Sequence, residues 1–315
     1  MNQTIDVFVG KNKELQDAYN ELTVSFNDSC DLVVRAYDEG VAYHFATRLN
    51  GEITIISEDA IFNFASTPTI YYPECDANYS GETDQSGRTH QVHQGYRNFE
   101  RLYKVYKGPL EIPYERFAVS PVLYEYPDSP YKVVVTESNT YDYPALYMES
   151  NGYNSMRGKW ANYPKETIDS DPSNPYYWYS NHLVVTRENY IAKTDGNRSF
   201  PWRVIIVSED DKSLLNNELV YKLADPCRLT DTSWIQPGKS AWEWWHKAVL
   251  EGVDFPSGNK QLSLQLYKYY VDWASKNHIE YMTLDAGWSK DYIKELCSYA
   301  EEKNVKVSVW TWASV

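Results

Sequence analysis

The sequence predicts a multidomain β plus α/β chain, in which an antiparallel β-sandwich is followed by an incomplete (β/α)8 barrel. Three observations predict this fold class. Short apolar runs separated by turn residues fill the region from Leu22 to Val207, a rhythm typical of all-β domains. After Pro237 the pattern changes to alternating strand and helix signals. These units cover residues 239–315, about a third of the roughly 250 residues that a closed barrel uses.

The predicted sandwich opens with a hairpin, residues 32–37 and 41–45, around Asp38-Glu39-Gly40. Gly40 suits the turn because glycine has no Cβ and tolerates positive φ. Further strands are expected at residues 53–56, 61–64, 131–136, 146–149, 182–185 and 204–207. Many strands and few helical periods favour a sandwich.

Two polar stretches interrupt that rhythm, residues 71–95 and 152–179, both rich in Asn, Asp, Ser, Pro and Tyr. Long loops inside a compact domain usually carry function or cover another surface. For most of their residues we favour the plainer interpretation, that they are variable surface excursions.

The second region reads as strand, helix, strand, helix, strand. Residues 240–245 predict a short aromatic strand, and residues 280–285 and 306–310 predict two more. Between the first two strands, one face of a helix is formed by Leu266, Tyr267, Tyr270, Trp273 and Ala274. Before the third strand, Ser289 can cap a helix with Asp291 in its first turn. The buried stripe of that helix is formed by Ile293, Leu296 and Ala300.

This succession predicts parallel strands joined by right-handed crossovers. The region is either a small three-stranded appendage or a barrel that stops after its third strand. The last residues, Trp310 to Val315, lie where a strand should pass into its loop, which favours the truncated barrel. We therefore predict a sandwich at residues 1–233 and the start of a barrel at residues 234–315.

The composition disfavours several classes of partner. The chain has 44 acidic and 30 basic side chains, a formal net charge of −14, which repels both nucleic acid and anionic lipid. No apolar run approaches the roughly 18 to 20 residues of a membrane span, and the first residues carry no secretory signal. The cysteines form no Cys-x-x-Cys pair, so buried free thiols are expected at Cys30, Cys75, Cys227 and Cys297.

Five collinear stretches match a known family: residues 35–43 (RAYDEGVAY), 136–144 (TESNTYDYP), 200–204 (FPWRV), 234–245 (WIQPGKSAWEWW) and 281–288 (YMTLDAGW). On these stretches the chain resembles glycoside hydrolase family 97, the α-glucosidases and α-galactosidases of glycan-foraging bacteria. The resemblance implies an N-terminal β-super-sandwich on a catalytic (β/α)8 barrel, with calcium in the active site. It also implies export to the periplasm or beyond, and a sandwich that lacks its first strands here.

Two positions depart mildly from the family pattern. Glu243 stands where the family usually has Asp, and Ser138 stands where it commonly has Ala. The longer Glu243 side chain places its carboxylate about one methylene farther out. Arg203 receives no role beyond a structural one.

Glycoside hydrolysis needs two carboxyl groups that flank the scissile bond, and in a barrel they stand at the C-terminal ends of strands. The resemblance places these groups on the fourth and later strands, beyond Val315. We therefore expect no catalytic residue in this chain, and no activity from it alone. The preference for glucosides or galactosides and the stereochemical outcome are set in the same missing region.

Glu137 is the predicted metal ligand. The resemblance aligns it with a sandwich glutamate that helps to hold Ca²⁺, and a hard carboxylate oxygen suits that ion. Without the family, it is a carboxylate near the end of a strand. Ca²⁺ needs six to eight oxygens, so we expect the ion in the complete protein rather than in this chain.

The predicted substrate-binding residues are Trp242, Glu243, Trp244, Asp285 and Trp288. Asp285 ends the second barrel strand, where a carboxylate can bind a sugar hydroxyl or, alternatively, loop amides. The tryptophans offer flat faces for sugar rings, although residues alternate sides along a strand and only some can face a ligand. The expected partner is an oligosaccharide or another α-glycoside.

Two rival interpretations stay open. The sandwich can act alone as a carbohydrate-binding module without catalysis, or the chain can be a degenerate remnant with no function.

Overall fold

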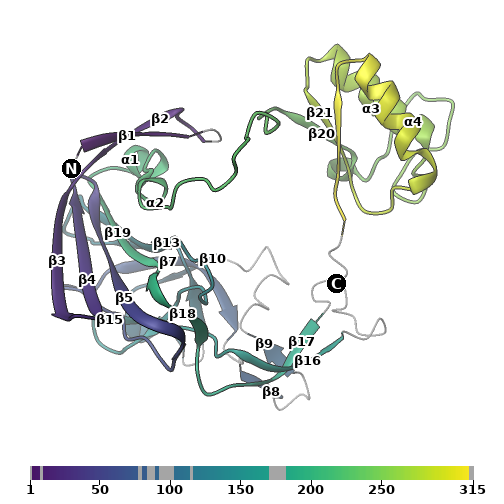
Figure 1. The fold of residues 1–315 in the computed structure, drawn as a ribbon. Coiled ribbons are helices and arrows are strands. Elements are labelled where there is room, and N and C mark those ends of the chain that lie inside the picture. The colour runs from purple at the N-terminus through teal and green to yellow at the C-terminus, as the bar shows by residue number, and fades with distance from the viewer. Residues whose placement is uncertain are drawn as a thin grey trace. The chain divides into compact units, whose positions relative to one another are not determined.

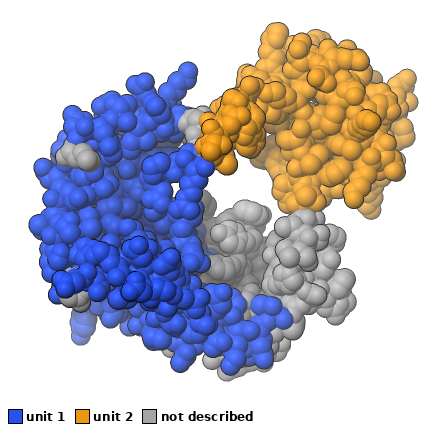
Figure 2. Space-filling model, viewed as in Figure 1, with its two compact units in different colours: residues 1–228 blue, residues 229–315 orange. Residues whose placement is uncertain are grey.

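The computed structural model describes residues 2–7, 10–76, 80–83, 89–91, 103–113, 116–169 and 182–311. The chain divides into two compact units, residues 1–228 and residues 229–315 (Figure 2). The boundary predicted after residue 233 therefore lies just inside the second unit. Each unit is described by itself below.

A 13-stranded antiparallel sheet dominates the first unit (Figure 1). Its main path runs β3-β4-β5-β19-β13-β12-β7-β11-β14-β15-β6, with β10 beside β7 and β18 beside β5. The strands are β3 (Asn20–Asn27), β4 (Cys30–Tyr37), β5 (Gly40–Ile55), β6 (Ile61–Asn63), β7 (Thr69–Asp76), β10 (Tyr103–Tyr106), β11 (Arg116–Val119), β12 (Val122–Glu125), β13 (Lys132–Ser138), β14 (Tyr147–Ser150), β15 (Ser155–Lys159), β18 (Ala192–Ser199) and β19 (Trp202–Ser208).

Smaller elements complete this unit. Three two-stranded sheets pair β1 (Asn2–Asp6) with β2 (Glu14–Ala18), β8 (Ser80–Thr83) with β9 (Thr89–Gln91), and β16 (Pro164–Asp169) with β17 (His182–Arg187). The helical segments are η3 (Pro109–Glu111), α1 (Asp211–Leu215) and α2 (Leu219–Lys222).

The predicted hairpin is confirmed as β4 and β5, which pair from Tyr37 and Gly40 outwards. Glycine is needed at position 40 because a Cβ there would lie 2.3 Å from the carbonyl oxygen of Ile205 on β19. Close approach of a neighbouring strand thus explains this glycine better than the turn does. The separate strand predicted at residues 53–56 is the far end of β5.

The polar stretches are not simply loops, which corrects the sequence interpretation. The first begins within β7, and the second contains β15 and β16. Their strands were missed because β7 carries Pro73 and Glu74 and β15 carries Arg157, which break the apolar alternation. Much of the rest of both stretches lies outside the described residues.

Burial of alternate side chains explains the main core of the first unit. Ile70, Tyr72, Val122, Tyr124 and Met148 are at most 2% exposed and form one cluster from three strands. Each strand directs every second residue to this side, so the cluster removes a continuous apolar surface from water.

The second unit confirms the predicted parallel succession. Its sheet has the order β20 (Ser240–Trp242), β21 (Tyr281–Leu284), β22 (Lys306–Val309), with parallel pairing throughout. The helices α3 (Leu264–Lys276) and α4 (Lys290–Glu302) lie side by side along it (Figure 1). Ser289 caps α4 as predicted, since its Oγ accepts from the Asp291 amide at 3.1 Å.

Two details of this unit differ from prediction. The aromatic strand ends at Trp242 and turns into a 3-10 helix, η5 (Glu243–His246). Trp273 is 46% exposed, and Val271 is buried in the core instead. Helical periodicity locates the buried face only to within about one residue on either side, so tertiary packing decides which flanking side chain is covered.

The described cysteines are more exposed than expected. Cys30 is half-buried, whereas Cys227 and Cys297 are exposed, so the expected burial is wrong for the latter two. The Cys75 side chain lies outside the described residues. Across the described ranges, no helix has the length and apolarity that a bilayer crossing requires.

Candidate functional site

The carboxyl ends of β20 and β21 meet at one edge of the small sheet. The two strands are parallel and in register, with Trp242 opposite Thr283. Glu243 therefore leaves β20 close to the point where Asp285 leaves β21. In a barrel this edge is where substrate binds.

Glu243 is turned inward, in contrast to its predicted contact with substrate. The residue is 2% exposed, and its Oε1 accepts from the Asp285 amide at 2.9 Å and from the Tyr267 hydroxyl at 3.1 Å. Glu243 lies two positions after the buried Ala241, on the face of the chain that packs against α3, where Tyr267 contacts it. The glutamate is a positioning residue for the Asp285 backbone in this structure.

The electrostatics of Glu243 are unusual for a carboxylate. Its Oε2 is buried and has no hydrogen-bond partner among the described residues. Burial raises the pKa of Glu243, and the charge of Asp285 adds to this, although the Asp285 amide and the Tyr267 hydroxyl act in the opposite direction. Among the described residues, no cation pairs with Glu243.

Asp285 itself is half-buried, and both predicted uses of its carboxylate remain compatible with the geometry. Its Oδ1 accepts from the Ala286 amide at 2.8 Å, which is the loop-amide alternative. Within the described chain its Oδ2 takes no hydrogen bond, so that oxygen is available to a ligand hydroxyl.

The tryptophans form an exposed aromatic group beside this edge. Trp244 is 56% and Trp245 is 74% exposed, whereas Trp242 is half-buried. The Trp242 and Trp244 rings stack at 5.2 Å with an interplanar angle of 20°, and Trp245 stands edge-on to both. Such exposed faces can pack against the apolar face of a pyranose.

Trp288 is held differently from the other tryptophans. It packs against the core of the second unit, and its Nε1 donates to the Trp310 carbonyl at 3.2 Å. This bond ties the loop after β21 to the end of β22.

A cavity of about 410 Å³ lies between β20 and α3, which the sequence analysis missed. Trp242, Trp245 and Trp273 contribute to its walls, and the Tyr270 hydroxyl and His246 Nε2 are 2.8 Å apart within it. These residues are distant in sequence and come together because α3 packs against β20.

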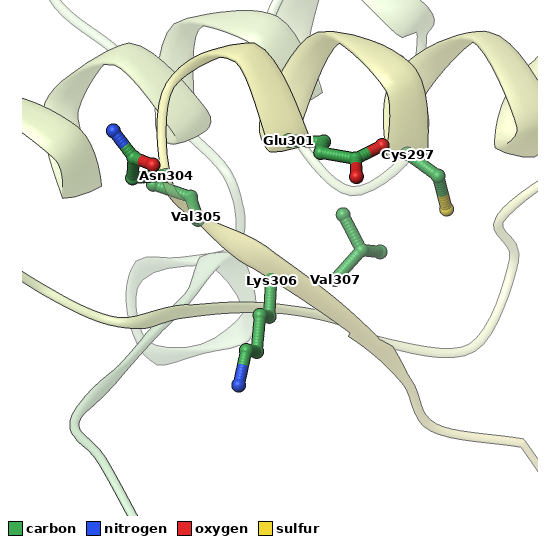
Figure 3. A pocket seen from close by; sticks show the side chains of 6 residues that line it. All are labelled: Cys297, Glu301, Asn304, Val305, Lys306 and Val307. Atoms are coloured by element: carbon green, nitrogen blue, oxygen red, sulfur yellow. The ribbon is translucent and has the colours of Figure 1, made fainter. Parts of the chain in front are cut away.

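A second hollow, of about 450 Å³, lies between the end of α4 and β22. Figure 3 shows the Glu301 carboxylate on the side of Cys297 and Val307, while Lys306 points to the other side of the strand. The hollow therefore does not bring an acid and a cation together, and we assign it no chemistry.

The first unit contains a buried ionic cluster around Arg203, which is 1% exposed. Its Nε and Nη2 each donate to Glu58 at 2.7 Å, and its Nη1 donates to Glu137 at 2.8 Å. The second Glu137 oxygen accepts from the Leu146 amide at 2.8 Å, and the Tyr143 hydroxyl donates to Glu58 at 2.9 Å.

The pKa shifts follow from this burial and pairing. Burial raises the pKa of Glu137, with the Leu146 amide and Arg203 partly opposing it. Burial alone would lower the pKa of Arg203, but its bonds and charge interactions with Glu58 and Glu137 raise the pKa overall. Sequence reasoning left Arg203 without partners and did not consider Glu58. The missing signal for this ion pair was the register of β13 and β19, which places Glu137 opposite Arg203.

The described residues do not fit a calcium ion at Glu137. Both carboxylate oxygens already hold hydrogen-bond donors, one of them a guanidinium. In the described part of the chain, no group of three or more His, Cys, Asp or Glu side chains could hold a metal. The calcium prediction therefore has no complete ligand set among these residues.

Comparison with protein families gives two matches. The family described as glycosyl-hydrolase 97 N-terminal matches residues 1–226, and the family described as glycoside hydrolase 97 matches residues 244–315. A retaining alpha-galactosidase of Bacteroides thetaiotaomicron is 34% identical over 310 residues, which are 94% of this chain and 44% of the relative. A probable retaining alpha-galactosidase of Streptomyces bingchenggensis is 35% identical over 132 residues, covering 37% and 19% of the two chains.

Solved structures share the fold. A family 97 enzyme from a Pseudoalteromonas species, in complex with acarbose, has a TM-score of 0.68 at 18% identity, covering 98% of this chain and 44% of that one. A beta-arabinopyranosidase also has a TM-score of 0.68, at 17% identity, with 100% and 46% coverage. The chain thus spans less than half the length of each of these relatives.

Proposed function

The chain belongs to glycoside hydrolase family 97, and on this premise we propose that the whole protein hydrolyses terminal α-glycosidic bonds. The observation that carries the proposal is the match of both units, in order, to the two parts of this family. An α-galactoside is the first substrate to test, because both curated relatives carry that name, and an α-glucoside is the second.

This chain would supply one side of the substrate site. We assign sugar stacking to the exposed ring of Trp244, supported by Trp242, and a hydroxyl contact to the free oxygen of Asp285. Glu243 acts through Asp285 by fixing its amide, and Trp288 fixes the loop that follows. The partner is an oligosaccharide or a simpler α-glycoside.

The catalytic pair is assigned to a part of the protein outside this chain. Retaining glycosidases use carboxyl groups about 5 to 5.5 Å apart, and inverting ones use groups about 6.5 to 9.5 Å apart. At the described strand ends only Asp285 presents an accessible carboxylate, since Glu243 is buried and already bonded. One accessible acid is insufficient for either mechanism.

Calcium and location are proposed from the family resemblance alone. We propose that Ca²⁺ assists the whole protein, and we derive no step through it because the described residues do not form its site. We also propose a periplasmic or secreted location on the same ground.

The test uses a chimaera. Residues 1–315 replace the matching 44% of the Bacteroides relative, and hydrolysis of p-nitrophenyl α-galactoside and α-glucoside is compared with that of the 315-residue chain alone. We expect turnover by the folded chimaera and none by the chain. Turnover by the chain alone would contradict the assignment of the catalytic acids elsewhere.

Within the chimaera, Asp285→Asn should lower kcat/KM by roughly 10- to 100-fold, the effect of losing a hydrogen bond to a charged group. Trp244→Ala should raise KM by about tenfold. Trp234→Ala is the matched control, because Trp234 is 68% exposed and lies outside the strand ends. Equal effects of all three substitutions would remove the assigned roles.

A further inference from the structure

The first unit contains a cavity of about 820 Å³ whose lining includes none of the residues assigned above to the hydrolytic site. Its lining includes Arg35 of β4, His44 of β5, Trp202 of β19 and residues 221–227. Strand β1 contributes residues 3–6 to its lining. The volume falls within the range of small-molecule sites, about 300 to 1,000 Å³.

The part of the cavity lining contributed by β1 is attached to the rest of the unit. The β1–β2 hairpin lies beside α1 and α2 (Figure 1), and its turn binds both helices. Lys11 donates to the Leu215 carbonyl, and Asn12 donates to Glu218 at 2.7 Å. Elements that line the cavity are therefore bonded to one another.

The cations at the cavity are already neutralised. Arg35 pairs with Glu21 at 2.8 Å, and its guanidinium lies over the rings of Tyr19 and Trp202, at 4.2 and 4.9 Å from their centroids. Lys222 pairs with Glu39 at 2.6 Å. An anionic ligand would have to compete with these carboxylates, and Asp6 and Asp225 add further negative charge to the lining, so the charge pattern disfavours an anion.

Polar groups without charge remain available to a neutral ligand. The Nδ1 of His44 lies 3.0 Å from the Phe45 carbonyl, and because a carbonyl only accepts, Nδ1 carries the proton and Nε2 is an acceptor. Burial lowers the pKa of His44, which keeps the ring neutral. The Oδ1 of Asn139 accepts from the Asp225 amide at 3.2 Å, which leaves the Nδ2 donors.

An aromatic face completes the set, since the Tyr221 ring is 53% exposed and lines the cavity. Neutral donors and acceptors beside an exposed ring are the features that bind a pyranoside, whose hydroxyls need hydrogen bonds and whose apolar face needs a ring. We propose that this cavity of the first unit is a binding site for a neutral saccharide. The proposal does not depend on the activity of the whole protein.

Isothermal titration of the 315-residue chain with maltotriose and with raffinose tests the proposal. We expect a dissociation constant on the order of 1 mM for at least one of them. Tyr221→Ala should weaken binding by about tenfold, and Asn139→Gly, which suits the φ of 62° at that position, should weaken it less. Tyr131→Ala is the matched control, because Tyr131 is 45% exposed in the same unit and does not line the cavity.

A second readout locates the site by chemical protection. Cys227 lines the cavity and is exposed, and Cys297 is exposed in the second unit. At saccharide concentrations about ten times the dissociation constant, alkylation of Cys227 by N-ethylmaleimide should slow by about tenfold while that of Cys297 is unchanged.

Three results would overturn the proposal. One is the absence of saccharide binding by a chain with a normal thermal transition. Another is binding that survives Tyr221→Ala but is lost in a Trp244→Ala, Trp245→Ala double variant, which would place the site in the second unit. The third is competition by inorganic phosphate, which would show that the cations are available to anions.

Discussion

Each unit of the molecule buries a carboxylate network, and the two networks are balanced in different ways. In the first unit, Glu58 and Glu137 share the guanidinium of Arg203, so that two partly buried negative charges meet one buried positive charge. In the second unit, Glu243 meets only neutral donors, the Asp285 amide and the Tyr267 hydroxyl.

The difference shows what each network can do. In the first unit the Arg203 guanidinium partly opposes the rise that burial causes in the pKa of Glu137, and the cluster depends strongly on that cation. A buried carboxyl with neutral donors responds to pH instead, because nothing opposes protonation except hydrogen bonds. The first network is a structural link between strands, whereas the second couples a strand end to the candidate substrate edge.

Removing the cation should give the largest effect. Arg203→Met leaves Glu58 and Glu137 buried without compensation, and we expect a loss of about 3 to 5 kcal/mol in the free energy of unfolding of the first unit. Urea unfolding, monitored in each unit by hydrogen exchange, measures this loss of stability.

Arg157→Met is the control. The Arg157 side chain is 49% exposed and pairs with Glu149, so its replacement should cost less than about 1 kcal/mol of stability. Equal losses of stability in Arg203→Met and Arg157→Met would mean that burial does not increase the contribution of the Arg203 cluster. Because burial raises the pKa of Glu137, acidification should reduce the Arg203→Met loss as this carboxyl group protonates.

Removing the neutral-donor carboxyl should have the next largest effect. Glu243→Ala leaves the Asp285 amide and the Tyr267 hydroxyl buried without a partner and opens a cavity, for a loss of about 2 to 4 kcal/mol in the second unit. The same unfolding measurement applies. Glu295→Ala is the control, because Glu295 forms an exposed ion pair with Lys268. This substitution should change the free energy of unfolding by no more than about 0.5 kcal/mol. If Glu243→Ala costs as little stability as Glu295→Ala, the positioning role of Glu243 is contradicted.

The isosteric variant Glu243→Gln should sharpen the comparison through pH. Since the folded pKa of Glu243 is raised, the native state binds more protons than the unfolded state between the ordinary and the raised value. Stability of the second unit should therefore fall as pH rises through that window. The glutamine variant should lack this slope, so its stability relative to the parent should improve with rising pH. An unchanged slope would show that Glu243 does not titrate there.

The smallest stability effect is expected at the exposed aromatic group. Trp244→Ala loses the stacking contact with Trp242 and should cost about 0.5 to 1.5 kcal/mol, because Trp244 is already 56% exposed. Thermal unfolding of the second unit measures this loss. A loss as large as that of Glu243→Ala would indicate a core role, and would weaken the assignment of this ring to saccharide binding.

A substantial part of the fold could be predicted from local patterns. The β4–β5 hairpin, the helix cap at Ser289 and the parallel order of β20, β21 and β22 were all visible in sequence, because turn, capping and periodicity rules act over a few residues. Strands such as β7 were not, because polar residues in them are accommodated by partners far along the chain.

The sequence by itself determined the family, the strand-helix succession and the residues gathered at the strand ends. The tertiary structure alone decided where those side chains point. Glu243 lies inward because its face of the chain packs against α3, and Arg203 meets Glu58, 145 residues away, because segments distant in sequence pack together. Local preferences span single turns of backbone, whereas contacts between distant residues depend on sheet register and packing, which only the folded chain sets.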